Sequence, residues 1–384
     1  MTSREWARSL LGKLDTAALK RFRRRSLLLT GDGSDDEIEA LCDLAGIFQA
    51  LDRAGVAVPL FPHQLFWALF FDASTRTKSS WAGAAARLGA QPVIVDGSST
   101  QMAHGETAEE TGAMLGMNAH ALGVRHDLIL GEGNRFMQAV KRGIDVYLGE
   151  TDDDRAVPVV NLQCDLDHPT QTLADLCWLR EYFPEGLRGK TVTVSWAYSP
   201  SYAKPLSVPQ GLITLLPRFG ANVRLAHPPG YDLIPETLEA ASRAAEDSGG
   251  LFTRMKDMDD AFSGADVVYP KSWGPYELMQ ERVGANSEGD EARLREIEQE
   301  ALERNRLHTD WICDERRMAL TRDGDGLYMH CLPADIGDEV SPAVLERFRT
   351  HVAQEANKKV YVIMALLAAA KEPNLVTRLG DSLG

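Results

Sequence analysis

The sequence predicts an α/β protein of two domains, each a mostly parallel sheet flanked by helices. The chain has 384 residues, which is more than one hydrophobic core usually fills. Short apolar runs also alternate with helical patterns, as in parallel sheets with crossover helices. These runs are 65–71 (LFWALFF), 91–97 (QPVIVDG), 145–150 (DVYLGE), 158–163 (PVVNLQ), 191–197 (TVTVSWA), 222–228 (NVRLAHP), 266–270 (DVVYP) and 326–333 (GLYMHCLP).

A domain boundary is expected near residue 167. Residues 170–182 have a helical pattern with leucines along one side, and residues 184–196 (PEGLRGKTVTVSW) then begin a new strand. We predict one domain over residues 1–167, joined by a C-terminal helix at 352–384, and a second domain over residues 168–351. The charged segment 287–306 is predicted to be a helix on the surface.

Composition excludes several classes of function. The net charge of −15 opposes binding to nucleic acid, and the basic cluster at 20–26 (KRFRRRS) is interpreted as a solvated helix face. The chain lacks both an apolar run of the roughly 18 residues that a membrane helix needs and an apolar signal core. Five cysteines without CxxC spacing indicate reduced thiols in a cytoplasm. No motif indicates a metal or another cofactor.

A polar turn follows the first apolar run. Ser74, Thr75, Arg76 and Thr77 separate it from the helical pattern of residues 78–89 (KSSWAGAAARLG). The first turn of a helix offers free N–H groups and a positive dipole end, and an arginine there adds a forked partner for phosphate oxygens. The same residues fit a helix N-cap with an exposed arginine about equally well.

Three more polar positions follow predicted strands, where parallel sheets bind ligands. Arg125 comes after the apolar run of residues 121–124, although an arginine there is more often a surface or ion-pair residue. His168 and Gln171 flank Pro169 and would share one face of a helix, but a capped helix start explains them too. Cys331 ends the last strand, where a lone cysteine is more often buried and inert.

Taken together and in this order, these motifs resemble the aspartate/ornithine carbamoyltransferase family. The resemblance rests on STRT (74–77), VRHD (124–127), HPTQTLAD (168–175) and HCLPAD (330–335), and it covers about residues 27 to 370. Residues 196–211 (WAYSPSYAKPLSVPQG) resemble the proline-rich loop of the knotted branch, which includes acetylornithine and succinylornithine carbamoyltransferases. The segments AHGET, NLQCD, AHPPGYDLIP and YPKSWGPY are most similar to its YgeW-type group. The resemblance implies a deep knot in the C-terminal domain.

The family transfers the carbamoyl group of carbamoyl phosphate to an amine and releases phosphate. The resemblance implies that residues 74–77 hold the phosphate and that Arg125 reaches both the phosphate and the carbonyl oxygen. Thr77 and His168 would donate to this oxygen as it becomes an oxyanion. Gln171 would hold the carbamoyl NH₂ group. The first domain would therefore bind carbamoyl phosphate.

Backbone carbonyls near Cys331 and Leu332 would also hold the carbamoyl NH₂, and Cys331 would lie beside the attacking amine. Asn161 and Asp165 match positions that ornithine-like enzymes place near the amino-acid substrate. The second domain would bind that substrate. Segment 98–107 (SSTQMAHGET) resembles the loop that neighbouring subunits exchange in family trimers. Gln101 and His104 would then complete the site of a neighbouring subunit in a homotrimer.

Two departures from the ornithine enzymes concern the second substrate and the carbamoyl site. Lys271 replaces an aspartate that grips the α-amino group of ornithine. A cation there repels an ammonium and favours a carboxylate or an acylated amine, so ornithine is not the expected substrate. The late ENR motif reads ANKK at 356–359, so that Lys359, or alternatively Lys358, replaces the arginine. A lysine supplies a point charge in place of a bidentate fork.

The sequence therefore predicts a cytoplasmic carbamoyltransferase that acts on a small amino-acid-like amine other than ornithine. The reverse reaction, phosphorolysis of a ureido acid, uses the same transition state and is equally compatible with the motifs. The alternative is a catalytically silent member of the family that binds anions or regulates a partner. A nucleotide-binding protein of the Rossmann type is excluded because no strand leads into GxGxxG.

Overall fold

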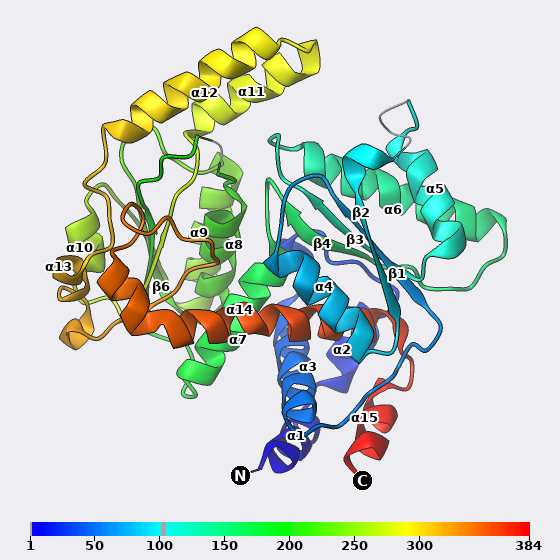
Figure 1. The fold of residues 1–384 in the computed structure, drawn as a ribbon. Coiled ribbons are helices and arrows are strands. Elements are labelled where there is room, and N and C mark those ends of the chain that lie inside the picture. Colours follow the sequence, from blue (N-terminus) through cyan, green and yellow to red (C-terminus); the bar gives the residue numbers. More distant parts are fainter. Residues whose placement is uncertain (1, 101–104, 203) are drawn as a thin grey trace.

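The computed structural model describes residues 2–100, 105–202 and 204–384, and it contains two parallel sheets that lie side by side (Figure 1). The strand order is β2-β1-β3-β4 in the first sheet and β7-β6-β5-β8-β9 in the second. The strands are β1 (Leu65–Phe70), β2 (Gln91–Asp96), β3 (Ala121–His126), β4 (Val159–Cys164), β5 (Thr191–Trp196), β6 (Asn222–Ala226), β7 (Leu251–Met255), β8 (Val267–Lys271) and β9 (Leu327–Tyr328). The predicted two-sheet α/β class is confirmed.

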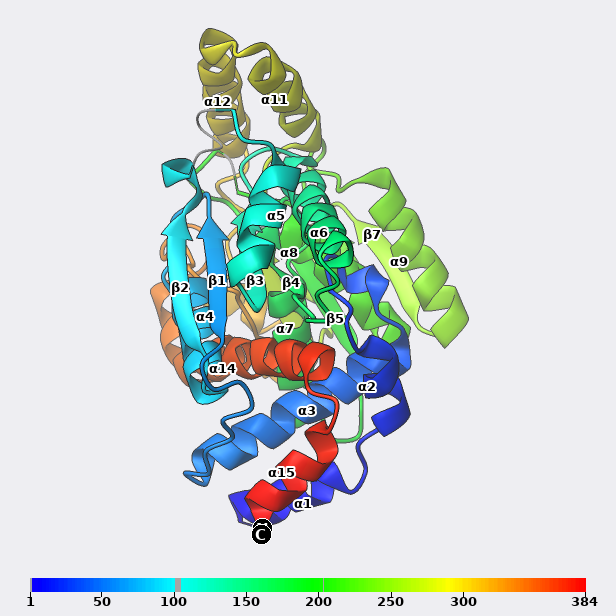
Figure 2. The ribbon, with the colours of Figure 1, turned by 90° about the vertical axis from the view of Figure 1, so that its right-hand side faces the viewer.

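Helices cover both faces of each sheet, as Figures 1 and 2 show from two sides. Their bounds are α1 (Ser3–Leu11), α2 (Thr16–Phe22), α3 (Asp35–Arg53), α4 (Arg76–Arg87), α5 (Ala108–Asn118), α6 (Glu132–Glu150), α7 (Pro169–Tyr182), α8 (Ser207–Leu215), α9 (Pro235–Ser248), α10 (Met258–Phe262), α11 (Tyr276–Glu288), α12 (Glu291–Arg306), α13 (Glu315–Met318), α14 (Pro342–Lys371) and α15 (Leu375–Leu383). None of the helices in the described ranges combines the length and the apolar composition that a membrane crossing requires.

Alternation along the strands of the first sheet divides its packing between two cores. Phe66 and Phe70 of β1 face the core that includes Trp81 of α4, whereas Leu69 faces a core with Val140 of α6. This period of two places helices on both faces of the sheet, as in other parallel sheets. The polar turn at 74–77 is thereby held between a buried strand and a buried helix.

The long helix α14 connects the two halves of the molecule. It starts beside the second sheet, where it contacts β9, and runs along α7, α3 and α4 near the first sheet (Figure 1). Its C-terminal half is almost wholly buried, including Lys358 and Lys359. Two charged side chains inside a core indicate that polar groups meet them there.

The structure corrects three local expectations. Residues 145–150, predicted as a strand, belong to α6, because Val140, Ile144 and Leu148 pack inward at a spacing of four while Val146 is exposed. The segment 287–306 is not one helix, because α11 ends at Glu288 and α12 begins at Glu291. The basic cluster at 20–26 is helical only as far as Phe22. Strand β7 was not predicted, because its residues are exposed or half-buried and form no strong apolar run.

Candidate active site

One cavity of about 500 Å³ collects residues that follow the carboxyl ends of strands from both sheets. Parallel sheets place the ends of several strands at one edge, so residues far apart in the sequence meet there. The predicted site residues that line it are Ser74, Thr75, Arg76, Thr77, Arg125, His168, Gln171, Lys271, Cys331, Leu332 and Lys359. The motifs that were separate in the sequence therefore share one space.

The turn at 74–77 begins helix α4 and faces this cavity. Thr75 is the N-cap of this helix and makes no side-chain cap hydrogen bond, whereas Ser74 Oγ accepts a hydrogen bond of 3.3 Å from the Thr77 N–H in the first turn. The same oxygen accepts a hydrogen bond of 3.3 Å from Arg125 Nη1. Ser74 therefore links the first turn of the helix to a second arginine, which suits the anion-binding interpretation.

The two arginines of the cavity have different hydrogen-bond partners. Arg76 is about half-buried, and its Nη2 donates a hydrogen bond of 2.5 Å to the backbone carbonyl of Leu332. Arg125 pairs with Asp127 at 3.0 Å, while its buried Nε has no hydrogen-bond partner among the described residues. Burial and the charge of Arg125 lower the pKa of Arg76 from its usual value. Two neighbouring guanidinium groups with unused donors favour a bound anion.

His168 is buried at the N-terminus of α7. Its pKa lies well below the usual range because of burial and the positive charges of Lys359, Arg125 and Arg76. The ring is therefore neutral near pH 7 and carries one N–H. Its Nδ1 lies 3.3 Å from Thr170 Oγ1, and its Nε2 lies 3.3 Å from Lys359 Nζ. A neutral imidazole of this kind can donate to an oxyanion without forming an imidazolium.

Gln171 is oriented by a buried acid. Its Nε2 donates a hydrogen bond of 2.6 Å to Asp175 Oδ1, which leaves the amide oxygen as an acceptor for the cavity. Burial raises the pKa of Asp175 to about 7. Burial and the charge of Asp175 raise the pKa of Glu355 well above its usual value. Tyr269 Oη bridges the two carboxyl groups at 3.3 and 3.4 Å.

The segment after β9 presents a backbone carbonyl to the cavity. Leu332 has φ +54°, and its N–H donates a hydrogen bond of 2.9 Å to His330 Nδ1. The left-handed conformation is unfavourable for leucine, so the turn is held by its surroundings, including Arg76 on the carbonyl. Burial raises the pKa of the Cys331 thiol, so this cysteine is a neutral neighbour and not a thiolate.

Of the two lysines that could replace the family arginine, Lys359 lines the cavity. Burial and the charges of Arg125 and Arg76 lower its pKa to about 8. Lys358 is directed elsewhere, because its Nζ donates a hydrogen bond of 2.6 Å to Gln49 Oε1 and pairs with Glu181. Of the two lysines, Lys359 is therefore the one that lies with the other predicted site residues.

Asn161 and Asp165 do not line the cavity. Asn161 is fully buried, and its amide donates to the carbonyl of Leu28 at 2.6 Å. Asp165 accepts hydrogen bonds from the N–H groups of Gly131 and Gly133 at the start of α6, and burial raises its pKa to about 6. Their placement gives no support to a contact with the second substrate. The predicted Gln101 and His104 lie outside the described residues.

Gln163, Ser201 and Lys204 also line the cavity, although the motifs did not indicate them. Gln163 Nε2 donates a hydrogen bond of 3.1 Å to Ser207 Oγ at the start of α8. Lys204 lies in the segment 196–211. The sequence predicted this segment as a proline-rich loop but indicated no role for Lys204. In the described part of the chain, no group of three or more His, Cys, Asp or Glu side chains is arranged to hold a metal ion.

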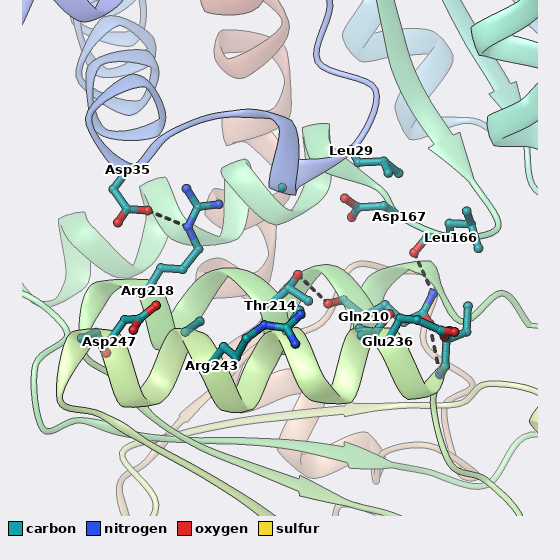
Figure 3. Close-up of a pocket in the computed structure, with 16 residues that line it drawn as sticks. Leu29, Asp35, Leu166, Asp167, Gln210, Thr214, Arg218, Glu236, Arg243 and Asp247 are labelled. Atoms are coloured by element: carbon teal, nitrogen blue, oxygen red, sulfur yellow. Dashed lines mark hydrogen bonds and ion pairs between the residues drawn. The ribbon is translucent and has the colours of Figure 1, made fainter.

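A larger cavity of about 660 Å³ lies between α8, α9 and the turn at Thr30–Asp32 (Figure 3). Arg218 on its wall is paired with Asp35 at 2.6 Å, and Gln210 Nε2 donates to the carbonyl of Leu166 at 2.7 Å. None of the residues predicted to take part in the reaction lines it. Size alone therefore does not identify the functional cavity.

Comparisons with known proteins agree with the motifs. The family model for the aspartate/ornithine carbamoyltransferase carbamoyl-P binding domain matches residues 25–181, and that for the Asp/Orn binding domain matches residues 206–370. The "Putative carbamoyltransferase YgeW" of Escherichia coli K12 is 45% identical over 358 residues, which is 91% of this chain and 90% of that protein. The N-acetylornithine carbamoyltransferase of Xanthomonas axonopodis pv. citri is 30% identical over 365 residues, with 90% of this chain and 96% of that protein covered.

A solved structure extends this agreement to the fold. The crystal structure of acetylornithine transcarbamylase complexed with acetylcitrulline superposes with a TM-score of 0.74 and 26% identity, and it covers 90% of this chain and 99% of that one. Both family models, the relatives and the solved structure thus indicate the same family. The chain belongs to the aspartate/ornithine carbamoyltransferase family.

Proposed function

We propose that this protein moves the carbamoyl group between carbamoyl phosphate and the amine of a small amino-acid-like substrate other than ornithine. The proposal rests on one observation. The residues that line one cavity include the 74–77 turn, Arg125, His168, Gln171 and Lys359. These groups come from both ends of the chain. Together they supply cations, a neutral imidazole donor and an amide acceptor, which are the partners that carbamoyl phosphate requires.

In this proposal the phosphate lies at the N-terminus of α4, where Ser74, Thr75 and Arg76 surround it and Arg125 reaches it from β3. The 3.3 Å bond between Ser74 and Arg125 supports the placement, because it brings the helix start and the second guanidinium to the same point. A helix N-terminus with two arginines favours a dianion.

The carbamoyl group then lies between His168, Thr77 and Gln171. His168 and Thr77 donate to the carbonyl oxygen, with Lys359 supporting them. The NH₂ group donates to Gln171 Oε1 and to the carbonyl of Leu332. The bond from Gln171 to Asp175 supports this assignment, because it fixes the amide oxygen as the free end.

The reaction joins the amine nitrogen to the carbamoyl carbon and breaks the bond from that carbon to the phosphate oxygen. The amine loses one proton, and phosphate leaves as the other product. Donors aimed at the carbonyl oxygen stabilise the tetrahedral intermediate, each by about 10²–10³ in rate. Holding the two reactants together supplies much of the remaining acceleration. The same steps in reverse convert a ureido acid and phosphate into carbamoyl phosphate.

Lys271 supports a second substrate other than ornithine. It lies at the end of β8 and lines the cavity, where an ammonium of the substrate would meet another cation. The relatives include N-acetylornithine carbamoyltransferases, whose named substrate has an acylated α-amine. A small amine with an acylated or absent α-amino group fits this wall better than ornithine does.

The proposed activity is tested by incubating the protein with carbamoyl phosphate and a panel of amines and measuring phosphate release. Candidate ureido acids with phosphate form the reverse panel, with carbamoyl phosphate as the product. Turnover of an acylated or carboxylate-bearing amine with little turnover of ornithine supports the proposal. Tight binding of carbamoyl phosphate in calorimetry without turnover in either direction would favour the silent anion-binding alternative.

We further propose a cytoplasmic homotrimer with active sites at subunit interfaces and a knot in the C-terminal domain. The support is the resemblance of segment 98–107 to an exchanged loop and of segment 196–211 to the knotted branch. Mixing inactive His168→Ala subunits with inactive Gln101→Ala subunits tests the shared site. Recovery of activity in the mixture is expected if one subunit completes the site of its neighbour.

A further inference from the structure

A third cavity, of about 540 Å³, lies among helices α1, α3, α7 and α14. Two cysteines that are far apart in the sequence line it, Cys42 of α3 and Cys177 of α7. The exposed residues Thr2, Arg53 and Pro184 also line it, so the cavity is open to solvent. Among the described residues, none lines both this cavity and the proposed active site. The proposed reaction therefore leaves the two thiols without a role.

The two thiols contact each other. Helices α3 and α7 pack together, and the thiol of Cys177 donates a hydrogen bond to the sulfur of Cys42. Cys42 is 5% exposed and Cys177 is half-buried, so the pair lies inside the fold with one side toward the cavity. A disulfide places its sulfurs about 2.05 Å apart, which is a short movement from a hydrogen-bonded contact. The arrangement therefore suits a bond between the two sulfurs.

Two cations lie beside the pair. Arg180, on the next turn of α7, donates a hydrogen bond to Cys42 and pairs with Asp43 at 3.1 Å. Lys358 also lines the cavity, and its charge acts on Cys177. The hydrogen bond from Cys177 and the charge of Arg180 lower the pKa of Cys42, against the effects of burial and of the neighbouring carboxylate. Because the thiolate is the reactive form of cysteine, Cys42 is the better nucleophile of the two.

The other three cysteines differ from the pair. Burial raises the pKa of Cys164, Cys313 and Cys331, so all three are neutral thiols near pH 7. Cys164 accepts a hydrogen bond of 3.3 Å from the Asn161 amide, and the Cys313 sulfur lies 3.6 Å from Met318 Sδ. Of the five cysteines, the pair on α3 and α7 thus combines a second thiol in contact, a lowered pKa and access from solvent.

We propose that Cys42 and Cys177 form a peroxide-sensitive dithiol site, which closes to a disulfide between α3 and α7. The Cys42 thiolate attacks one oxygen of hydrogen peroxide, the O–O bond breaks, and the products are a sulfenic acid and hydroxide. The Cys177 sulfur then attacks the Cys42 sulfur, its thiol proton joins the departing hydroxyl group, and water leaves. In total, the two thiols lose two electrons and two protons, and one peroxide becomes two waters.

Hydrogen peroxide suits the site because it is close to water in size and the cavity is open to solvent. The disulfide joins α3 to the helix whose N-terminus carries His168 and Gln171. A small dithiol restores both thiols by exchange. The inference does not depend on the proposed function, since the two sulfurs lie outside the active-site cavity.

Thiol counting on the reduced full-length protein tests the site. The protein is treated with hydrogen peroxide, catalase ends the reaction, and N-ethylmaleimide labels the remaining thiols after denaturation. Mass spectrometry is expected to show a cross-linked peptide pair that contains Cys42 and Cys177, and labelling of every cysteine after dithiothreitol. The cross-link should form at least about tenfold faster than the oxidation of Cys331, because that thiol is neutral. Equal rates, or full labelling of Cys42 and Cys177 after peroxide, would overturn the proposal.

Variants assign the two roles. Cys177→Ser should stop at a sulfenic acid on Cys42, which dimedone traps, because the resolving thiol is gone. Cys42→Ser should lose the fast reaction, since its hydrogen bond to residue 42 and burial hold the pKa of Cys177 well above the usual value. Cys313→Ser is the matched control and should form the cross-link at an unchanged rate, because Cys313 lies against Met318 and does not line the cavity. Fast oxidation of Cys177 in Cys42→Ser would overturn the proposal. The labelling of the unmodified protein stands even if a variant fails to fold.

Discussion

Arg76 and Leu332 are 256 positions apart in the sequence, yet the guanidinium of Arg76 donates a hydrogen bond of 2.5 Å to the backbone carbonyl of Leu332. Arg76 is the first residue of α4, beside the first sheet, and Leu332 follows β9 of the second. The bond therefore crosses the cavity, and the guanidinium of Arg76 and the carbonyl of Leu332 both lie at its wall. It links the proposed phosphate site to the proposed carbamoyl site.

Arg76→Ala should reduce kcat/KM for carbamoyl phosphate by about 10²–10³, since it removes a donor at the site of developing charge. Arg76→Lys should recover only part of the loss, because an ammonium cannot reproduce the forked contact. Arg87→Ala is the control: this exposed arginine lies on the same helix and pairs with Asp52 at 3.0 Å. Steady-state kinetics measure both. An unchanged kcat/KM in Arg76→Ala would contradict the placement of the phosphate.

Asp175→Asn should raise KM for carbamoyl phosphate by about tenfold, through Gln171. The carboxylate accepts the 2.6 Å hydrogen bond that fixes the Gln171 amide, and an asparagine can turn its NH₂ toward that position. A double-mutant cycle separates this effect from general damage: adding Asp175→Asn to Gln171→Ala should cost little more than Gln171→Ala alone. Additive losses would show that Asp175 acts independently of Gln171. Asp43→Asn is the matched control, because Asp43 of α3 pairs with Arg180 and does not line the cavity.

The rate should depend on pH in a bell shape whose basic limb lies near pH 8. On the acidic side the rate rises with pH, because the reacting amine of the substrate must lose its proton to become nucleophilic. On the basic side it falls, because Lys359, whose pKa burial lowers to about 8, is charged below that pH and neutral above it. A neutral lysine no longer attracts carbamoyl phosphate. The pH dependence of kcat/KM for carbamoyl phosphate reports this group in the free enzyme.

Lys359→Arg tests the assignment of the basic limb. Arginine stays protonated throughout the range, so the fall above pH 8 should disappear while the acidic limb remains. Lys358→Arg is the matched control, since the neighbouring lysine contacts Gln49 and Glu181 away from the cavity. A basic limb that survives Lys359→Arg would assign it to another group.

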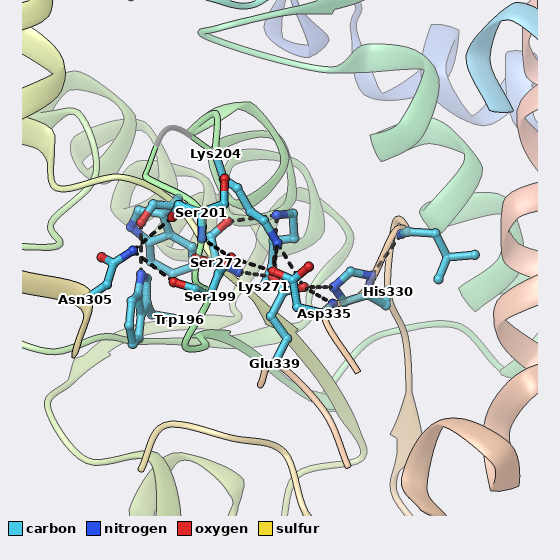
Figure 4. Close-up of polar contacts among 12 residues, drawn as sticks. Trp196, Ser199, Ser201, Lys204, Lys271, Ser272, Asn305, His330, Asp335 and Glu339 are labelled. Carbon is cyan, nitrogen blue, oxygen red and sulfur yellow. Dashed lines mark hydrogen bonds and ion pairs between the residues drawn. The ribbon is translucent and has the colours of Figure 1, made fainter. Parts of the chain in front are cut away.

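Local patterns predicted most of the strands and the order of the polar motifs, because both depend on neighbours in the sequence. They could not reveal that Gln163, and not Asn161, reaches the cavity. Asn161 pairs with Val124, but the register shifts after that pair, so Gln163 comes opposite Arg125. A bulge of this kind is a property of two paired strands. The contacts of Lys204 with Asp335 and Glu339 (Figure 4) could not be predicted for a similar reason, since these residues meet only after the second sheet has formed.

The close packing of α5 on α6 gives a prediction about stability. A Cβ on Gly143 would lie 2.0 Å from the carbonyl oxygen of Glu109, whereas a Cβ on Gly149, in the same helix, would have no heavy atom within 4 Å in the described part of the chain. Gly143→Ala should therefore force α5 away and lower the free energy of unfolding by about 1–3 kcal/mol. Gly149→Ala should raise it by about 0.4–1 kcal/mol, because alanine loses less backbone entropy on folding. Urea titration of the two variants measures the difference, and equal midpoints would contradict the contact between the helices.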